Sequence, residues 1–387
     1  MLNKINSNVE KLNKSATLKI TALTKKMVSQ GKDVVNFAAG EPDFDTPDFI
    51  KQAAKIAIDK GFTKYTPSAG LPALREAIAK KLNDENGMNV SAANIIVTAG
   101  AKYAIYVGLL TVVEPGDEII VPVPYWVSYP EMAALLGARM VNVATRQEDG
   151  FKLKPSELAK VVTSKTRVLI LNYPSNPTGV TYTKEELEEI LKIAKKNNFY
   201  VLSDEIYEKL IYDGSDHVSF ASLPGAQDLT ITVNGFSKAF SMTGWRLGYL
   251  VANDEFIGHA SKIIGHTTSC SCTISQHAAI AALADITWQA QIQKEFQNRR
   301  DLLYKGLSGI KNFKPMKSNG TFYMFCDVSG TGLSSFDFAS RLLEEKLVSC
   351  IPADSFGADG FVRLSFATSS DQINKGIIRI KEFVESL

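Results

Sequence analysis

Short, continuous apolar runs mark the first two thirds of the chain, and polar segments of helical character separate them. The runs stand at residues 95–98, 118–121, 168–171, 200–203, 230–233 and 247–250. They are rich in Ile, Val and Leu and mostly lack the apolar–polar alternation of a half-exposed strand. Such runs predict strands that are buried on both faces, as in a parallel sheet covered by helices.

Helix start signals lie between the predicted strands. Pro72 precedes an apolar stretch at a position typical of a first helical turn, and Thr183 to Glu186 has the form of a capping box. A further helix is expected over residues 103–112, opened by small residues. This alternation predicts an α/β fold, with a large domain whose mostly parallel sheet is flanked by helices.

The pattern changes after about residue 290. A long helical stretch that includes residues 296–303 precedes shorter strands near Phe322 and Arg363 and a final helix from about Asp371. This order predicts a second, smaller α+β domain. We expect the chain to divide as follows: an N-terminal arm, 1–14; a small domain, 15–45 and 290–387; and a large domain, 46–289.

Composition excludes several function classes. The 387 residues include 43 Lys+Arg and 41 Asp+Glu, so no strong basic field favours nucleic acid or an anionic membrane. The first residues do not resemble a signal peptide, and no apolar run approaches the roughly 18 residues of a membrane span. The sequence therefore predicts a cytoplasmic protein that acts on small molecules.

The cysteine and histidine residues show no metal-ligand spacing, and we expect no metal site. Cys270, Cys272, Cys326 and Cys350 are interpreted as reduced thiols, with a redox role for the Cys270–Cys272 pair as the alternative. The histidines, His217 among them, are interpreted as structural.

Polar residues follow several predicted strands at the point where each strand ends. Ligands of open α/β sheets bind beyond these carboxyl ends, so we expect the residues to converge. They are Gly100, Ala101 and Lys102 after the first strand, Asn176 after the third, Asp204 and Tyr207 after the fourth, and Ser237, Lys238 and Arg246 after the fifth. Taken singly, each has a plain alternative as a turn residue, a helix cap or a surface side chain.

Lys238 is the most informative of these residues. A lysine at the end of a buried strand can form a Schiff base with a pyridoxal aldehyde. Ser237 and Arg246, on either side of it, can hold a phosphate. The set therefore indicates a site for pyridoxal 5'-phosphate.

Motifs along essentially the whole chain carry a family resemblance. They are Gly40-Glu41-Pro42-Asp43-Phe44, Tyr65-Thr66-Pro67, residues 125–130, Asn176-Pro177-Thr178-Gly179, Asp204-Glu205-Ile206-Tyr207, Ser237-Lys238 and residues 361–365. In content and order they resemble the aspartate aminotransferase family, the class I aminotransferases of the pyridoxal-phosphate superfamily, and most of all its bacterial branch. The resemblance implies fold type I of these enzymes and a homodimer with sites at the subunit interface.

The resemblance also implies roles for the residues at the strand ends. Lys238 would hold the cofactor and shuttle the substrate proton, and Asp204 would pair with the pyridine nitrogen. Tyr207 and Asn176 would hydrogen-bond the ring's 3-oxygen, while Trp126 would stack on the ring face.

Phosphate and substrate contacts are implied in the same way. Ser237, Arg246 and the backbone of Gly100, Ala101 and Lys102 would bind the phosphate, with Tyr65 reaching in from a second subunit. The substrate would meet Arg363, which would clamp its α-carboxylate, and Gly40, whose backbone would approach it closely. Trp126 and Asn176 would border the substrate as well. Lys102 would meet a distal carboxylate, which favours aspartate and glutamate.

The implied reaction converts aspartate and 2-oxoglutarate to oxaloacetate and glutamate, by ping-pong exchange through a pyridoxamine-phosphate intermediate. Alternatives are an aminotransferase of other specificity (prephenate/glutamate, aromatic or alanine) and a carbon–sulfur lyase, which shares the fold and the lysine. A non-catalytic regulator would need an added DNA-binding domain, which we do not expect here. Two segments depart from the bacterial pattern: Asn13-Lys14-Ser15, where relatives often read Lys-Pro-Ser, and Gly320-Thr321-Phe322-Tyr323, where relatives read Gly-Ala-Phe-Tyr.

Overall fold

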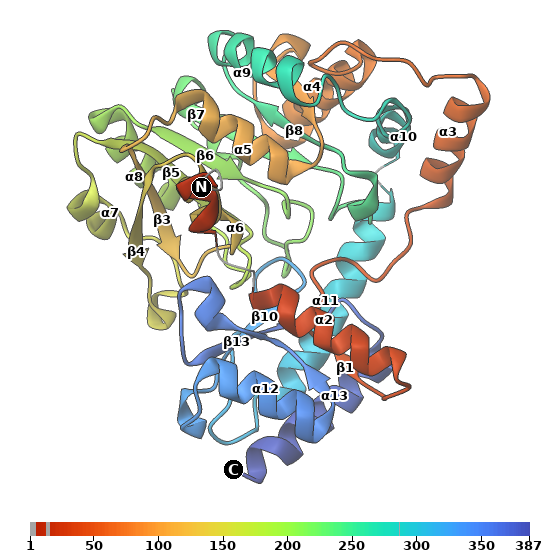
Figure 1. The fold of residues 1–387 in the computed structure, drawn as a ribbon, viewed down its shortest axis with the longest axis vertical. Helices are drawn as coiled ribbons and strands as arrows, with labels where there is room; N and C mark the ends of the chain where they lie inside the picture. The colour runs from red at the N-terminus through yellow and green to blue at the C-terminus, as the bar shows by residue number, and fades with distance from the viewer. Residues whose placement is uncertain (1–4, 13–15, 286) are drawn as a thin grey trace.

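A seven-stranded sheet forms the centre of the larger half of the molecule (Figure 1). The computed structural model describes residues 5–12, 16–285 and 287–387. The strands are β2 (Ile95–Thr98), β3 (Glu118–Val123), β4 (Arg139–Ala144), β5 (Thr166–Asn172), β6 (Tyr200–Asp204), β7 (Thr230–Gly235) and β8 (Gly248–Val251). Their order is β2-β8-β7-β6-β5-β3-β4, and all run parallel except β8, which is antiparallel to both of its neighbours.

The predicted strands and the mostly parallel sheet are confirmed, and one strand was missed. Strand β4 lies at the edge of the sheet, where most of its residues are at least partly exposed. It therefore lacks the continuous apolar run that identified the other strands.

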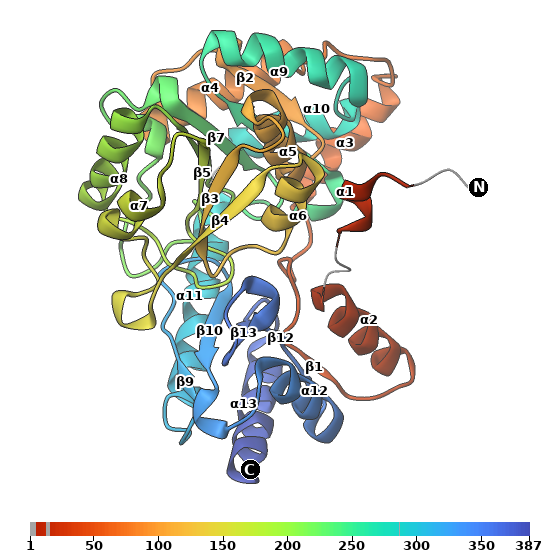
Figure 2. The same cartoon turned by 60° about the vertical axis from the view of Figure 1, so that its left-hand side comes forward.

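Helices cover both faces of this sheet (Figure 2). Helices α5 (Ala101–Val112), α6 (Ser128–Leu135) and α9 (Asp254–Thr267) pack on one face. The other face is covered by α7 (Pro155–Val161) and α8 (Lys184–Asn197) over one half and by α3 (Asp48–Asp59), α4 (Pro72–Asn86) and α10 (Thr273–Ala284) over the other. The start signals at Pro72 and Thr183 are confirmed, since Pro72 opens α4 and a complete capping box opens α8.

The smaller half holds an antiparallel sheet of β12 (Ile351–Pro352), β13 (Phe361–Ser365), β10 (Tyr323–Asp327) and β9 (Lys314–Pro315). Its apolar core is shared with α11 (Thr287–Leu307), α12 (Ser335–Lys346) and α13 (Ser370–Glu385). Helix α11 is the longest of the described helices and runs from the larger half into the smaller one (Figure 1).

Residues from the beginning of the chain join the smaller half. Strand β1 (Val35–Asn36) pairs in parallel with β11 (Val348–Ser349), and α2 (Ala16–Ser29) lies beside them (Figure 2). The short helix α1 (Ser7–Glu10) instead contacts α6 on the larger half. Loops from near the N-terminus can therefore reach the edge where the two halves meet.

Within the described ranges, no helix is both long and apolar enough to cross a membrane. All four cysteines carry free thiols, and Cys326 and Cys350 are buried.

Candidate active site

A cavity of about 370 Å³ opens at the carboxyl ends of the parallel strands, where the two halves meet. Its volume lies in the range of small-molecule sites, roughly 300–1,000 Å³. Most of the residues singled out from the sequence line it: Gly40, Ala101, Lys102, Trp126, Asn176, Asp204, Tyr207, Ser237, Lys238, Arg246 and Arg363. The convergence expected from strand topology is therefore present in the folded chain.

Lys238 lies just beyond the end of β7. Its Nζ donates a hydrogen bond to the carbonyl oxygen of Gly40 at 2.6 Å. Burial lowers the pKa of this amine to about 8, the nearby guanidinium groups act in the same direction, and Glu41 and Asp204 oppose them. At pH 7 roughly a tenth of the amine is therefore unprotonated and nucleophilic, far more than for a lysine with an ordinary pKa.

Asp204 ends β6 and is almost fully buried. Burial raises the pKa of its carboxyl group to about 6. The hydroxyl of Tyr129 donates to Oδ2 at 2.7 Å and the backbone N–H of Ile206 approaches Oδ1 at 3.4 Å, and both bonds favour the ionised form. The carboxylate is thus oriented towards the cavity by groups that stabilise its charge.

Tyr207 follows one turn after Asp204 and meets a second phenol. The hydroxyls of Tyr207 and Tyr323 are 3.1 Å apart, and burial raises the pKa of Tyr207 well above its ordinary value. Both phenols are neutral near neutral pH and can donate hydrogen bonds into the cavity. Tyr323 was not among the residues predicted from the sequence.

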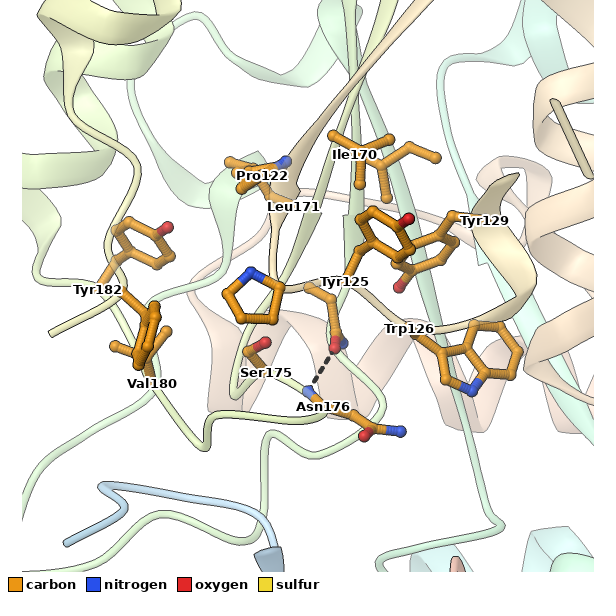
Figure 3. Close-up of a pocket in the computed structure, with 14 residues that line it drawn as sticks. Pro122, Tyr125, Trp126, Tyr129, Ile170, Leu171, Ser175, Asn176, Val180 and Tyr182 are labelled. Carbon is orange, nitrogen blue, oxygen red and sulfur yellow. Dashed lines mark hydrogen bonds between the residues drawn. The ribbon is translucent and has the colours of Figure 1, made fainter. Parts of the chain in front are cut away.

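Trp126 follows β3 and forms one wall of the site. Its ring lies edge-on to Tyr129, with centroids 5.4 Å apart, and the two side chains stand next to each other in Figure 3. The Nζ of Lys102 is 4.8 Å from the Trp126 ring centroid. Burial, aided by the charge of Arg246, lowers the pKa of Lys102.

Asn176 is held by its own loop. Its backbone N–H donates to the side-chain oxygen of Asn172 at 2.8 Å, the dashed bond in Figure 3. This bond fixes the turn after β5, so the Asn176 side chain faces the cavity that Trp126 also lines.

Gly100 and Arg246 form a cradle at the start of α5. Gly100 has φ +88°, and a Cβ added there would lie 2.6 Å from Nη2 of Arg246, so only glycine allows this approach. The Nη1 of Arg246 donates to the carbonyl oxygen of Thr243 at 2.7 Å. Among the described residues no carboxylate pairs with Arg246, which leaves its charge and the N-terminus of α5 available to an anion.

Arg363 reaches the cavity from β13 in the smaller sheet. It is only 4% exposed, with Nη1 2.9 Å from Oδ1 of Asn176 and Nη2 3.3 Å from the carbonyl oxygen of Ala38. Its Nε is buried without a hydrogen-bond partner, and no carboxylate of the described chain forms an ion pair with it. A buried, unpaired guanidinium is costly, and a carboxylate ligand would satisfy it.

Some predicted residues lie elsewhere. Tyr65 is 88% exposed and does not line the cavity. The segment Asn13-Lys14-Ser15 lies outside the described residues. The segment Gly320-Thr321-Phe322-Tyr323 also departs from the bacterial pattern, with Thr321 where relatives have alanine. The hydroxyl oxygen of Thr321 accepts a hydrogen bond from the N–H of Tyr323 at 3.1 Å, so this threonine contributes to the loop that carries Tyr323.

Sequence reasoning missed Tyr129 although a signal was present. Tyr129 stands three positions after Trp126, within the motif at residues 125–130 and at the start of α6. Ala38 and Thr243 were missed because they contribute backbone carbonyls, which no side-chain pattern reveals.

The chain is similar to known aminotransferases along nearly its whole length. The profile of the family described as aminotransferase class I and II matches residues 32–380. An aspartate aminotransferase of Bacillus sp. (strain YM-2) is 45% identical over 386 residues, covering 98% of each chain. An aspartate/prephenate aminotransferase of Thermus thermophilus is 41% identical, covering 97% of each. The structure of an aspartate aminotransferase from Thermus thermophilus with maleate superposes with a TM-score of 0.95 at 40% identity, covering both chains completely.

Proposed function

The chain belongs to the class I and II aminotransferase family, and from that premise we propose that it transfers the amino group of aspartate to 2-oxoglutarate with pyridoxal 5'-phosphate as its cofactor. One observation carries the proposal. The amine of Lys238, with its lowered pKa, and the unpaired guanidinium of Arg363 line the same cavity. A nucleophilic amine beside a carboxylate-binding group suits chemistry on an α-amino acid.

The donor set fits pyridoxal 5'-phosphate. Gly100 and Arg246 offer a cradle that suits a phosphate, and Asp204 offers a buried carboxylate for a protonated ring nitrogen. The Trp126 ring offers an apolar face for an aromatic ring, and the Tyr207 hydroxyl can donate to a phenolic oxygen. These complementary groups line one cavity or adjoin it.

Pyridoxal 5'-phosphate, when bound, withdraws electrons from the Cα of an attached amino acid. Lys238 is the base that takes the Cα proton and returns it, since its lowered pKa allows both steps near neutral pH. Asp204 would place its carboxylate at the ring nitrogen and keep that nitrogen protonated. Arg363 orients the α-carboxylate so that the Cα–H bond faces Lys238.

Lys102 supports an acidic side chain in the substrate. Its ammonium lies beside Trp126 and, in the described residues, pairs with no carboxylate. A second candidate substrate is prephenate, because a relative of similar identity acts on aspartate and prephenate according to its name. Both substrates are anionic at the end opposite the reacting centre.

We also propose a cytoplasmic homodimer. The free thiols of the cysteines suit a reducing compartment. Tyr65 is exposed at the surface, together with Ile56, Ile58 and Phe62. Exposed apolar side chains that lie close together in the sequence suit contact with a second copy of the chain, in which Tyr65 would reach the phosphate of its neighbour.

The proposal is tested by a single-turnover assay on purified protein loaded with pyridoxal 5'-phosphate. Aspartate, glutamate, phenylalanine, alanine and cystathionine are added separately, and the absorbance of the bound cofactor is followed. Rapid change with aspartate and glutamate only is expected. Rapid change with phenylalanine or alanine would contradict the specificity assigned to Lys102, and ammonia and pyruvate from cystathionine would indicate a lyase.

Lys238→Ala provides the control for the chemistry. The variant should lose transaminase activity. Substantial retained activity would contradict the role of Lys238. Steady-state assays with prephenate as acceptor then separate the two candidate substrates.

A further inference from the structure

A buried polar cluster lies behind the cavity, on the opposite side of β6. Side chains alternate between the two faces of a strand, so Ser203 and Glu205 face away from the cavity that Asp204 lines. Glu205 is completely buried and the His217 side chain nearly so. A carboxylate in such a place needs several hydrogen-bond donors to remain in the fold.

Glu205 has a full set of donors. Its Oε1 accepts from the hydroxyl of Ser203 at 2.7 Å, the hydroxyl of Ser219 at 3.0 Å and the backbone N–H of Phe220 at 3.2 Å. Its Oε2 lies 2.9 Å from Nε2 of His217, and an N–H at Nε2 would donate to it. Glu205 thus ties the end of β6 to the segment that carries His217 and Phe220.

Glu208 links the same part of the chain to α4. Its carboxylate pairs with the ammonium of Lys81 and accepts from the side-chain amide of Asn86 at 2.6 Å. Burial opposes ionisation of Glu208, but the charges of Lys81 and Lys209 outweigh it and lower the pKa to about 2. The Glu208 carboxylate therefore remains ionised near neutral pH.

Glu205, Glu208 and His217 are also the kind of residues that bind metal ions, and their ligand atoms lie within 4.8 Å of one another. Lys81 already supplies a cation at Glu208, and Nε2 of His217 lies within hydrogen-bond distance of Glu205. Both carboxylates of the cluster therefore have partners without a metal ion, whereas Nδ1 of His217 is buried without a hydrogen-bond partner.

The spacing of the motif links this cluster to the cavity. Asp204 and Tyr207 face the cavity, whereas Glu205 and Glu208, each one position further on, face the cluster. We propose that Glu205 and His217 are positioning residues, which hold the 204–207 segment from behind so that Asp204 and Tyr207 meet the cofactor ring. This inference rests on the proposed function, because it assigns the two residues to cofactor binding.

The test uses the full chain, freed of cofactor and titrated with pyridoxal 5'-phosphate. His217→Phe removes the donor to Glu205, and Glu205→Gln removes the carboxylate while keeping its shape. Each should raise the dissociation constant about tenfold, the lower end of the effects seen when partners of metal-site ligands are removed. The kcat should fall as well, while KM for aspartate should hold, since Arg363 lies on another sheet. His217→Gln, which can still donate to Glu205, should restore binding to within about threefold.

Leu158→Ala is the matched control, because it truncates a fully buried side chain in α7, a helix that packs on α8 and β4. It should lower the melting temperature at least as much as His217→Phe and leave cofactor affinity within about twofold. Equal loss of affinity in this control, or unchanged affinity in both His217→Phe and Glu205→Gln, would overturn the positioning role. Failure of the unmodified protein to bind pyridoxal 5'-phosphate would instead overturn the proposed function.

Discussion

Removing one hydroxyl group, that of Tyr129, should shift the pH range in which the protein binds its cofactor. The hydroxyl donates to Oδ2 of Asp204 at 2.7 Å and stabilises the ionised carboxylate, whose pKa burial has raised to about 6. In Tyr129→Phe the desolvation remains and the compensating bond is lost. The pKa of Asp204 should therefore rise further.

The size of the shift follows from the strength of the bond. A hydrogen bond to a charged group contributes about 1.5–3 kcal/mol, and one pKa unit corresponds to about 1.4 kcal/mol, so a rise of about 1–2 units is expected. At pH 7 the carboxyl group of the unmodified protein is about nine-tenths ionised. In the variant the ionised fraction should lie between about one half and one tenth.

The assay is a titration of cofactor-free protein with pyridoxal 5'-phosphate between pH 5 and pH 9. Affinity should decline towards acid pH in both proteins, with the decline of Tyr129→Phe centred about 1–2 units higher and the affinities converging near pH 9. Tyr182→Phe is the matched control, since the Tyr182 hydroxyl bonds to the N–H of Leu153 and not to Asp204. An equal loss of affinity at every pH would refute the reasoning, because it would show lost packing rather than altered ionisation.

Three further predictions concern the charges and the cradle of the site. Asp204→Asn should abolish activity yet stabilise the cofactor-free protein: the folded pKa of about 6 lies above the unfolded value of 3.8, so the protonated form contributes stability that is lost as pH rises through 6. Chemical denaturation should therefore show a gain of up to about 3 kcal/mol at pH 7.5, which falls to about 0.5 kcal/mol at pH 4. Arg363→Lys should raise KM for aspartate by about 30- to 100-fold, because a lysine cannot form the bidentate pair, and cofactor affinity measured in parallel should be unchanged. Gly100→Ala should weaken pyridoxal 5'-phosphate at least about tenfold, since the added Cβ displaces Arg246, whereas unphosphorylated pyridoxal should bind as before; equal weakening of both would contradict the phosphate cradle.

The sequence predicted the strands of the larger sheet because each buried strand is a local apolar run, and strand β4 was missed because it is exposed at the edge. The convergence of Asn176, Asp204 and Lys238 was predictable from topology alone, since carboxyl ends of parallel strands share an edge. The unpaired state of Arg363 could not be predicted, because it depends on which carboxylates lie nearby in the folded chain.

The contacts that hold the 204–207 segment in place could not be predicted from the sequence either. Glu205 and His217 are 12 positions apart and meet only because the chain between them folds back beneath β6. From the sequence, His217 was interpreted simply as structural. The specific role proposed for His217 depends on its distance from Glu205 in the folded chain. The residue types alone do not reveal that distance.

The reversed direction of β8 affects the spacing of two residues proposed to contact the cofactor. Because β8 is antiparallel to β7, the connection between them leaves and returns at one edge, with Gly235 opposite Gly248. Lys238 and Arg246 therefore lie on a single hairpin-like connection, and the spacing between the amine and the phosphate-binding guanidinium is set locally. A shift of the smaller sheet would carry Arg363 with it and leave this spacing unchanged. The fold thus places two proposed cofactor contacts on one connection of the larger sheet and the proposed substrate contact, Arg363, on the smaller sheet.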